Sequence, residues 1–199
     1  MVPVLQISVF SSGNTKGIAQ TRHAQVIGRV ELDFGHFYVA TYVKNVTAPT
    51  WNGETAAIIG LRTKWQGLNI ASSATLRQAV DAKPGTDATA PEFAASIARP
   101  IGRFTPIVSA IYTPDELGAS KTSFYIEGGA SYTLAKGLTA SAGLGRRHRV
   151  LALDYTAWNA GLGWSPSKHF ALDARYWDTD GPSVWPYKSR FVLSAIAKF

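Results

Sequence analysis

Twelve stretches rich in Val, Ile, Thr, Tyr, Phe and Trp follow one another along the chain, and each has the length of a long β-strand. Most run about 9–13 residues, more than the five or six typical of globular proteins and close to what a tilted strand needs to cross a bilayer. The sequence contains no helix-period segment of useful length. The predicted strands cover residues 3–11, 23–34, 36–46, 54–65, 68–81, 91–103, 105–113, 121–134, 138–149, 155–164, 168–178 and 187–199.

The connections between these strands alternate between long and short. The longer ones contain "GNTKGIAQTRH", "TAPTWNG", "AKPGTDATAP", "DELGAS", "VLALD" and "TDGPSVWP", and the short ones fall at Gly35, at 66–67, near Thr105, at 135–137 and at 165–167. A soluble sandwich has no need of this alternation, whereas outer-membrane barrels have short periplasmic turns and longer external loops. We therefore predict an all-β, 12-stranded antiparallel up-and-down transmembrane β-barrel that occupies residues 1–199 as a single domain. An even strand count puts both termini on the periplasmic side of a Gram-negative outer membrane.

Composition agrees with this class. Charged residues make up 17% of the chain, against roughly 25% in typical globular proteins, yet mean hydropathy is −0.01. No segment approaches the ~20 apolar residues of a membrane helix, which excludes a helical membrane protein. The chain has no cysteine, so disulfides and thiolate zinc sites are excluded, and its net charge of +7 favours anionic partners. No secretory signal precedes the first strand, so an exported protein would be represented here by its mature form.

The C-terminal segment "KSRFVLSAIAKF" alternates apolar residues up to its last position, Phe199. Taken alone, it also suits the last strand of a soluble sandwich. In hydrocarbon, however, each unpaired backbone group costs several kcal/mol, so a spanning sheet must close without an edge. We expect this strand to pair with the first one, "VPVLQISVF". A terminal Phe can lie at the membrane interface, where the outer-membrane insertion machinery recognises it.

Aromatic residues cluster near the ends of the predicted strands. One set lies by the short turns or the chain end and is expected to form a girdle in contact with outer-membrane lipid: Phe34, Trp65, Phe104, Tyr132, Trp164 and Phe199, with Phe170 beside them. A second set lies toward the long connections and is expected to form the opposite girdle: Tyr42, Trp51, Tyr112, Phe124, Tyr155 and Tyr176.

Strand alternation predicts which charges face the lumen, because an Arg or Lys on the lipid face near the midplane costs roughly 2–4 kcal/mol. The expected pore-lining residues are Arg29, Glu31, Asp33, Arg62, Lys64, Arg77, Glu127, Arg147, Arg149, Asp173, Arg175 and Arg190, with Asp81, Lys188 and Lys198 also inward. The strands at 91–103 and 105–113 resist assignment, since Arg99 and Arg103 share parity with Phe93 and Ile101. Pro100 and Pro106 are expected to mark bulges there.

The predicted lumen holds more base than acid, and two interpretations remain open. A basic wall favours small anionic solutes and disfavours cations, which makes a narrow, selective passive channel. Alternatively, the arginines pair with the carboxylates in a structural network that plugs the barrel. Twelve strands lie between filled eight-stranded barrels and open porins, so strand number alone does not choose between them.

Other chemistry has weaker support. A lipid-modifying enzyme would need a Ser beside a His, and His148, with Asn159 one strand away, has no such Ser on its face; we therefore expect no enzyme. The four His are scattered without ligand spacing, so neither a metal nor a cofactor is expected. "GLGRRHR" would split its charges between two faces of a strand, which argues against nucleic-acid binding. A purely structural or adhesive barrel stays possible.

Several short motifs resemble the TorF (Gcw_chp) family of Gram-negative outer-membrane barrels, in the same order over most of the chain. They are "TKGIAQT", "FYVATYVKNV", "YTPDELGASKTSFYIEGGASYTLAKGLTASAGLG", "TAWNAGLGWS", "LDARYWDTD" and "VLSAIAKF". The sequence departs from the family pattern at Lys16, where Arg is usual, and at "ETAAIIGLRTKW", which replaces an acidic segment containing Tyr. The resemblance implies an outer-membrane barrel involved in transport and supplies no substrate.

Overall fold

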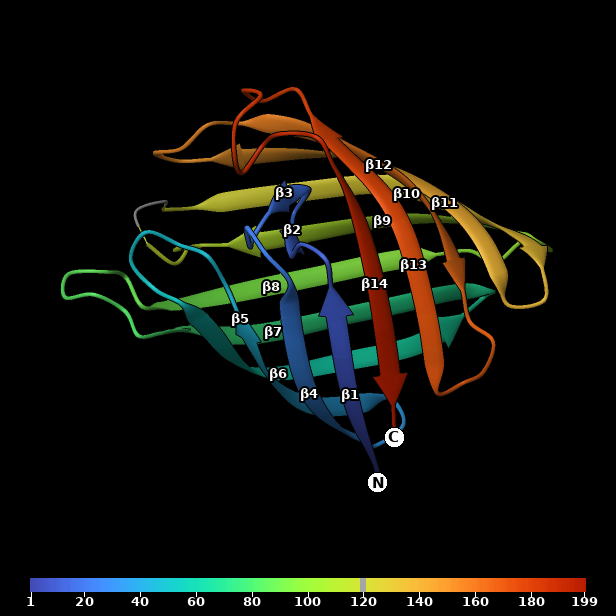
Figure 1. The fold of residues 1–199 in the computed structure, drawn as a ribbon. Helices are drawn as coiled ribbons and strands as arrows, with labels where there is room; N and C mark the ends of the chain where they lie inside the picture. The colour runs from blue at the N-terminus through green and yellow to red at the C-terminus, as the bar shows by residue number, and fades with distance from the viewer. Residues whose placement is uncertain (119–120) are drawn as a thin grey trace.

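The computed structural model describes residues 1–118 and 121–199 and forms a closed ring of twelve long antiparallel strands (Figure 1). Each long strand pairs with its neighbours along the chain, and the last strand closes on the first. The long strands are β1 (Val2–Phe10), β4 (Gln25–Asp33), β5 (Phe37–Asn45), β6 (Gly53–Trp65), β7 (Leu68–Val80), β8 (Thr89–Ala98), β9 (Phe104–Thr113), β10 (Ser123–Ala135), β11 (Leu138–Arg149), β12 (Tyr155–Trp164), β13 (Phe170–Thr179) and β14 (Arg190–Lys198). The predicted fold class is confirmed. Among the described residues, no helix is long and apolar enough to span a membrane.

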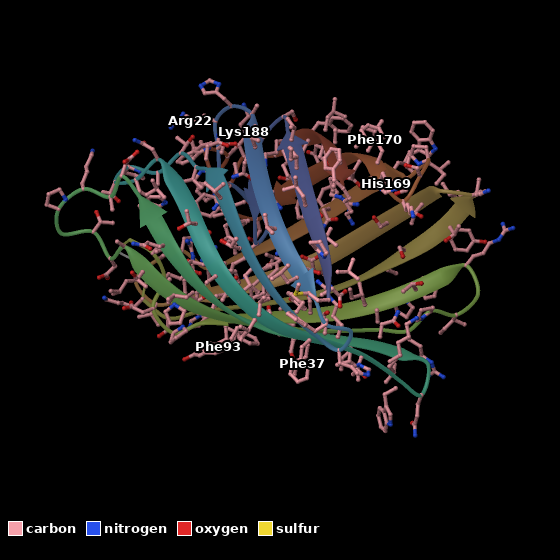
Figure 2. The ribbon with its side chains drawn as sticks, turned by 90° about the horizontal axis from the view of Figure 1, so that it is seen from below. Arg22, Phe37, Phe93, His169, Phe170 and Lys188 are labelled. Carbon is pink, nitrogen blue, oxygen red and sulfur yellow. The ribbon has the colours of Figure 1, made fainter. Side chains whose placement is uncertain are left out.

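The expected alternation of connections is present along most of the chain. Short turns follow β4, β6, β8, β10 and β12, and Gly35, Gly67 and Gly137 adopt positive φ in three of them. Longer connections follow β1, β5, β7, β9 and β13 at the opposite end of the barrel. The connection after β11, residues 150–154, also lies at that end but is no longer than the turns after β8 and β12, so the alternation in length fails there. In Figure 2, Arg22 and Lys188 mark the end with the long connections, and His169 and Phe170 mark the end with the short turns.

The seam between β1 and β14 closes the barrel as the sequence predicts. Gln6 to Phe10 pair with Lys198 to Ser194 in antiparallel register. Beyond this register, the backbones of Leu5 and Phe199 exchange hydrogen bonds of 3.1 and 2.8 Å. The two termini therefore lie side by side (Figure 1).

The outer wall of the barrel is apolar. Ile59, Leu76 and Leu144 are 64%, 54% and 60% exposed, values that a soluble core would not allow. Figure 2 shows Phe37 and Phe93 projecting from the wall in the same way. Buried residues instead concentrate inside the barrel, in small clusters around Tyr155 and around Ala90. This inverted distribution is the one a bilayer requires.

The structure also fixes the facing of β8 and β9. β8 ends at Ala98, so Arg99 and Arg103 lie in the turn before β9 rather than on the lipid face. Phe93 points outward and pairs with Tyr112, while Glu92 lies inside. The expected bulges at Pro100 and Pro106 are wrong: Pro100 is in the turn, and Pro106 pairs with Ala130 without a register shift.

Two further inward assignments need correction, because one strand ends earlier and another begins later than predicted. β7 ends at Val80, which leaves Asp81 exposed in the following connection with a positive φ of 56°. β14 begins at Arg190, which leaves Lys188 exposed in the connection before it.

Candidate functional site in the barrel lumen

At the end with the short turns, inward side chains from β4 and β6 form a group of ion pairs. Arg62 places its two terminal nitrogens 2.7 and 3.0 Å from the Glu31 carboxylate, and Arg29 donates to the same carboxylate at 2.6 Å. The Arg62 guanidinium also lies 3.9 Å from the centre of the Tyr38 ring. Asp33 is 4.0 Å from Arg62. Glu31 is thus shared between two arginines, and its charge cannot neutralise both.

Two open cavities of about 630 and 580 Å³ adjoin this group and share Arg62. We call them together the vestibule. Their charged lining comprises Arg29, Arg62, Lys64 and Lys198 against Glu31 and Asp33, with His36, Asn69 and Gln6 as further polar groups. Four cations face two carboxylates here, so the vestibule is positive.

At the opposite end, the connection between β1 and β4 folds into the lumen as a small hairpin. Its strands are β2 (Asn14–Thr15) and β3 (Ile18–Ala19), and Lys16 and Gly17 form its tip with positive φ. Ile18 packs against Tyr155 and Ala157 of β12. A Cβ at Gly17 would overlap that of Ala157, so glycine is needed for this close approach. In Figure 1 the hairpin lies beyond the upper ends of β1 and β4, and β9 and β10 are seen behind it.

The tip of the hairpin carries Lys16 into a group of carboxylates. Its ammonium nitrogen lies 2.6 Å from Glu116 Oε1, 2.8 Å from Glu92 Oε2 and 3.2 Å from Thr113 Oγ1. The Lys16 side chain is only 3% exposed. Its three N–H donors therefore have three oxygen partners and no access to bulk water.

These carboxylates continue into a wider set of buried charges. Arg77 donates to both oxygens of Glu54 at 3.0 and 2.9 Å and to Glu92 at 3.2 Å. Arg147 donates to Glu116 at 2.5 Å, and Lys44 lies 3.2 Å from Glu54. We call this set the buried network: Lys16, Lys44, Arg77 and Arg147 with Glu54, Glu92 and Glu116. It fills the lumen at the level of the hairpin, where Glu54, Thr113 and Tyr155 are 0% exposed.

Glu116 belongs to the connection after β9, and the neighbouring cations strongly affect the ionisation of its carboxyl group. Burial alone would raise the pKa of its carboxyl group, but Lys16, Arg147 and Arg77 hold that pKa well below its ordinary value. Glu116 therefore stays ionised, and it joins the hairpin to the wall.

At the rim, other pairs tie the long connections together. Lys121 donates to Asp87 at 3.0 Å and lies 3.5 Å from Asp115, and these two carboxylates raise the pKa of that lysine. A hydrogen bond from His148 and another from the Arg149 backbone lower the pKa of Asp154. His148 thus lies at the rim, whereas Asn159 is buried inside and accepts from Arg175 at 2.6 Å. The two do not form one site.

The remaining predicted lumen residues make local contacts inside the wall. Arg175 donates to Asp173 at 3.0 Å and to Ser141 at 2.7 Å. Glu127 accepts from Tyr125 at 2.5 Å, and Arg149 donates to the Leu153 carbonyl at 2.5 Å. Arg190 donates to Asn14 and to the Gly17 carbonyl of the hairpin. The structure brings Arg77 and Arg147 into one network and leaves the others in separate groups.

Sequence reasoning missed five residues of the buried network: Lys16, Lys44, Glu54, Glu92 and Glu116. Glu54 shares parity with Arg62 on β6 and could have been found from it. The facing of Glu92 cannot be assigned from the sequence, because the predicted strand at 91–103 includes Arg99 and Arg103, which share parity with Phe93 and Ile101. Lys16 and Glu116 lie in connections, where no periodicity indicates that a side chain points inward.

The first aromatic set is exposed and lies at the end with the short turns, with exposed fractions from 40% for Phe170 to 70% for Phe199. The second set divides. Tyr112, Phe124 and Tyr176 are 43%, 42% and 37% exposed, but Tyr42 and Tyr155 point inward and contact Glu54 and Lys16. Trp51 packs in a loop cluster with Ala79. The expected second girdle is therefore wrong for these three residues.

Within the described ranges, no His, Asp and Glu side chains form a group that could hold a metal ion.

Solved structures with similar folds are outer-membrane barrels. The KdgM porin has a TM-score of 0.64 at 13% identity, covering 98% of this chain and 99% of that one. The NanC porin has a TM-score of 0.65 at 8% identity, covering 98% of both chains. An outer-membrane channel from Pseudomonas putida F1 has a TM-score of 0.63 at 11% identity, covering 99% of this chain and 95% of that one. KdgM has also been solved in complex with disordered oligogalacturonate. At these identities the likeness shows the fold.

The sequence comparisons add a family. A family model described as a bacterial protein of unknown function (Gcw_chp) matches residues 5–198. No functionally curated protein matches the sequence. The Gcw_chp part of the predicted resemblance is thereby confirmed, while the name TorF stays a prediction.

Proposed function

The chain belongs to the Gcw_chp family, and from its lumen we propose that it is a narrow passive channel for small anionic solutes in the Gram-negative outer membrane. The observation that carries the proposal is the charge of the vestibule, where Arg29, Arg62, Lys64 and Lys198 outnumber Glu31 and Asp33. Fixed positive charge in a low-dielectric cleft concentrates anions and repels cations. The porin-like neighbours support transport as the general activity. Oligogalacturonate, present in one KdgM complex, is itself an anion.

The same proposal assigns the remaining predicted lumen residues to the wall of the pathway. Arg77 and Arg147 lie at its narrow part, and Arg190 lies beside the hairpin. Arg149 contacts Tyr187, and Arg175 lies on β13. Glu127 and Asp173 are the acidic members there. The proposed role is passage without catalysis.

Membrane placement follows from the outer wall. We propose that outer-membrane lipid covers the exposed apolar residues, and that Phe34, Trp65, Phe104, Tyr132, Trp164 and Phe199 form the periplasmic girdle. In this proposal both termini lie in the periplasm, and Phe199, which is 70% exposed, is available to the insertion machinery.

The buried network favours a second candidate, a plugged structural barrel. At the level of the hairpin, cations and carboxylates are paired, and their side chains are largely buried. This candidate predicts no conductance at any voltage.

A planar-bilayer recording separates the two candidates. We expect small discrete conductance steps in a KCl gradient, with a reversal potential on the anion side. Lys64→Glu should move the reversal potential toward that of cations, because Lys64 lines the vestibule. The matched control is Lys136→Glu, which lies at the same end of the barrel but on an exposed turn. This substitution should leave the reversal potential unchanged. Silence would favour the plugged barrel, and cation preference in the unchanged protein would refute the charge argument.

A further inference from the structure

We infer that Lys16 is a latch: its ion pairs hold the hairpin β2–β3 inside the lumen, and their release opens the channel. The effect on conductance rests on the proposed function. The docking of the hairpin does not, so the two can be tested separately.

The hairpin cannot hold this position by its own stability. Its two strands pair at only two positions, Asn14 with Ala19 and Thr15 with Ile18. An isolated two-stranded hairpin is marginal even when it is longer. The inward position must therefore come from contacts with the barrel wall.

Lys16 supplies contacts that reach across the lumen. The hairpin is attached at β1 and β4, whereas the partners of Lys16 are Glu92 on β8, Thr113 on β9 and Glu116 just after it. In the ring of twelve strands, β9 lies six places from β1, which is the opposite wall. The ion pairs thus connect opposite sides of the barrel and close the pathway between them.

The other hairpin contacts are less strongly charged. Tyr155 donates to the Lys16 carbonyl at 2.6 Å, Arg190 donates to Asn14 and the Gly17 carbonyl, and Ile18 packs on Ala157. Within residues 14–19, Lys16 is the only ionised side chain. Removing its charge should therefore loosen the hairpin more than any other single change within it.

The wall can tolerate the loss of this charge. Without Lys16, the buried network keeps Lys44, Arg77 and Arg147 against Glu54, Glu92 and Glu116, which are equal in number. Withdrawal of the hairpin therefore leaves no excess carboxylate charge in the lumen. A buried carboxylate without a partner would be strongly destabilising. The balance of charges in the wall is thus compatible with reversible withdrawal of the hairpin from the lumen.

Cysteine labelling of the refolded full chain tests the docking directly. The chain has no cysteine of its own, so Ile18→Cys provides one thiol on the hairpin, at a position 7% exposed. We expect slow reaction with a membrane-impermeant charged maleimide, and in Ile18→Cys/Lys16→Met a rate higher by at least about tenfold, since the docked state then opens more often. The matched control, Ile18→Cys/Lys83→Gln, changes an exposed lysine in another long connection and should label slowly. Val184→Cys, 60% exposed, should label rapidly with or without Lys16→Met.

Planar-bilayer recording then tests the effect of releasing the hairpin on conductance. Lys16→Met should raise the open fraction or the step size, while Lys83→Gln should match the unchanged protein. Equal labelling of the Ile18→Cys variants with and without Lys16→Met would overturn the latch. Faster labelling without any conductance would uphold the latch and refute the proposed channel. If Lys16→Met does not refold, Glu92→Gln weakens the same contact from the wall and should give the same faster labelling; unchanged labelling there would equally overturn the latch.

Discussion

Glu116 joins three elements although it lies in a connection that carries no regular pattern. It accepts from Lys16 of the hairpin, from Arg147 of β11 and from Ser123 of β10. Nothing in "TPDELGAS" indicates that this glutamate turns inward while the neighbouring Asp115 stays nearer the rim. The position of Glu116 depends on cations from distant parts of the chain, so the sequence around Glu116 cannot predict it.

Glu116→Gln should destabilise the folded barrel by about 3–5 kcal/mol at neutral pH, because it removes one partner of buried ion pairs. The measurement is the temperature of unfolding of the refolded protein, followed by mobility on a gel. Asp87→Asn, which removes an exposed partner of Lys121, is the matched control and should have little effect.

The stability difference between the unchanged protein and Glu116→Gln depends on pH, because the pKa of Glu116 is lowered in the folded state. A carboxyl group with a lowered pKa in the folded state contributes its full stabilisation above its ordinary value of 4.5. It loses that contribution as the pH falls through the lowered pKa. The gap between the unchanged protein and Glu116→Gln should thus be constant from neutral pH to about 5 and narrow below that. A gap that widens in acid would contradict the assignment.

Among the elements, β5, β6 and β10–β11 depend on glycines that leave space for aromatic rings. A Cβ on Gly60 would overlap the ring of Tyr38 on β5, and one on Gly145 would overlap Tyr125 on β10. Tyr38 is the residue on which Arg62 stacks, so the glycine of β6 indirectly positions the vestibule.

Gly60→Ala should destabilise the barrel by about 1–3 kcal/mol, the usual cost of an overpacked site. It should also weaken anion preference, because a displaced Tyr38 no longer supports Arg62. Gly128→Ala is the matched control: it lies within β10, and its added methyl group meets nothing within 4 Å. Equal unfolding temperatures for the two variants would show that Tyr38 can move at no cost.

The strands were well predicted because their alternation repeats over a dozen segments, and β11 and β12 have the predicted bounds. Prediction failed where a strand met a turn. The sequence predicts Arg99 and Arg103 as strand residues because the chain stays rich in Ile and Phe around them, and nothing local marks Ala98 as the last residue of β8. The hairpin β2–β3 was also missed, since two-residue strands are too short to show any period.

For the whole molecule, closure predicts resistance to detergent. All twelve long strands are paired on both sides, so the described sheet has no free edge from which unfolding can begin. The refolded protein should migrate at different apparent sizes on a gel before and after boiling. A water-soluble native form without such a shift would contradict the membrane barrel.

The sequence could predict the wall of the barrel but not how far its interior is filled. Parity reveals which side of each strand faces inward, and a net charge of +7 suggests a basic lumen. It does not reveal that three glutamates at one level pair with four cations, or that a connection supplies one of those cations. The direction in which a side chain points is set by alternation within its own strand. Whether the lumen is filled depends on contacts between side chains from opposite sides of the ring.

Neighbouring long strands elsewhere in the ring are joined by a stretch of chain, whereas β1 and β14 are held together by non-covalent pairing. This pairing consists of five residue pairs in register and the flanking backbone hydrogen bonds, including those between Leu5 and Phe199. The cylinder can therefore be unrolled into a flat sheet along this one line without breaking any covalent bond or crossing any loop. Mechanical or thermal parting of the wall should start there.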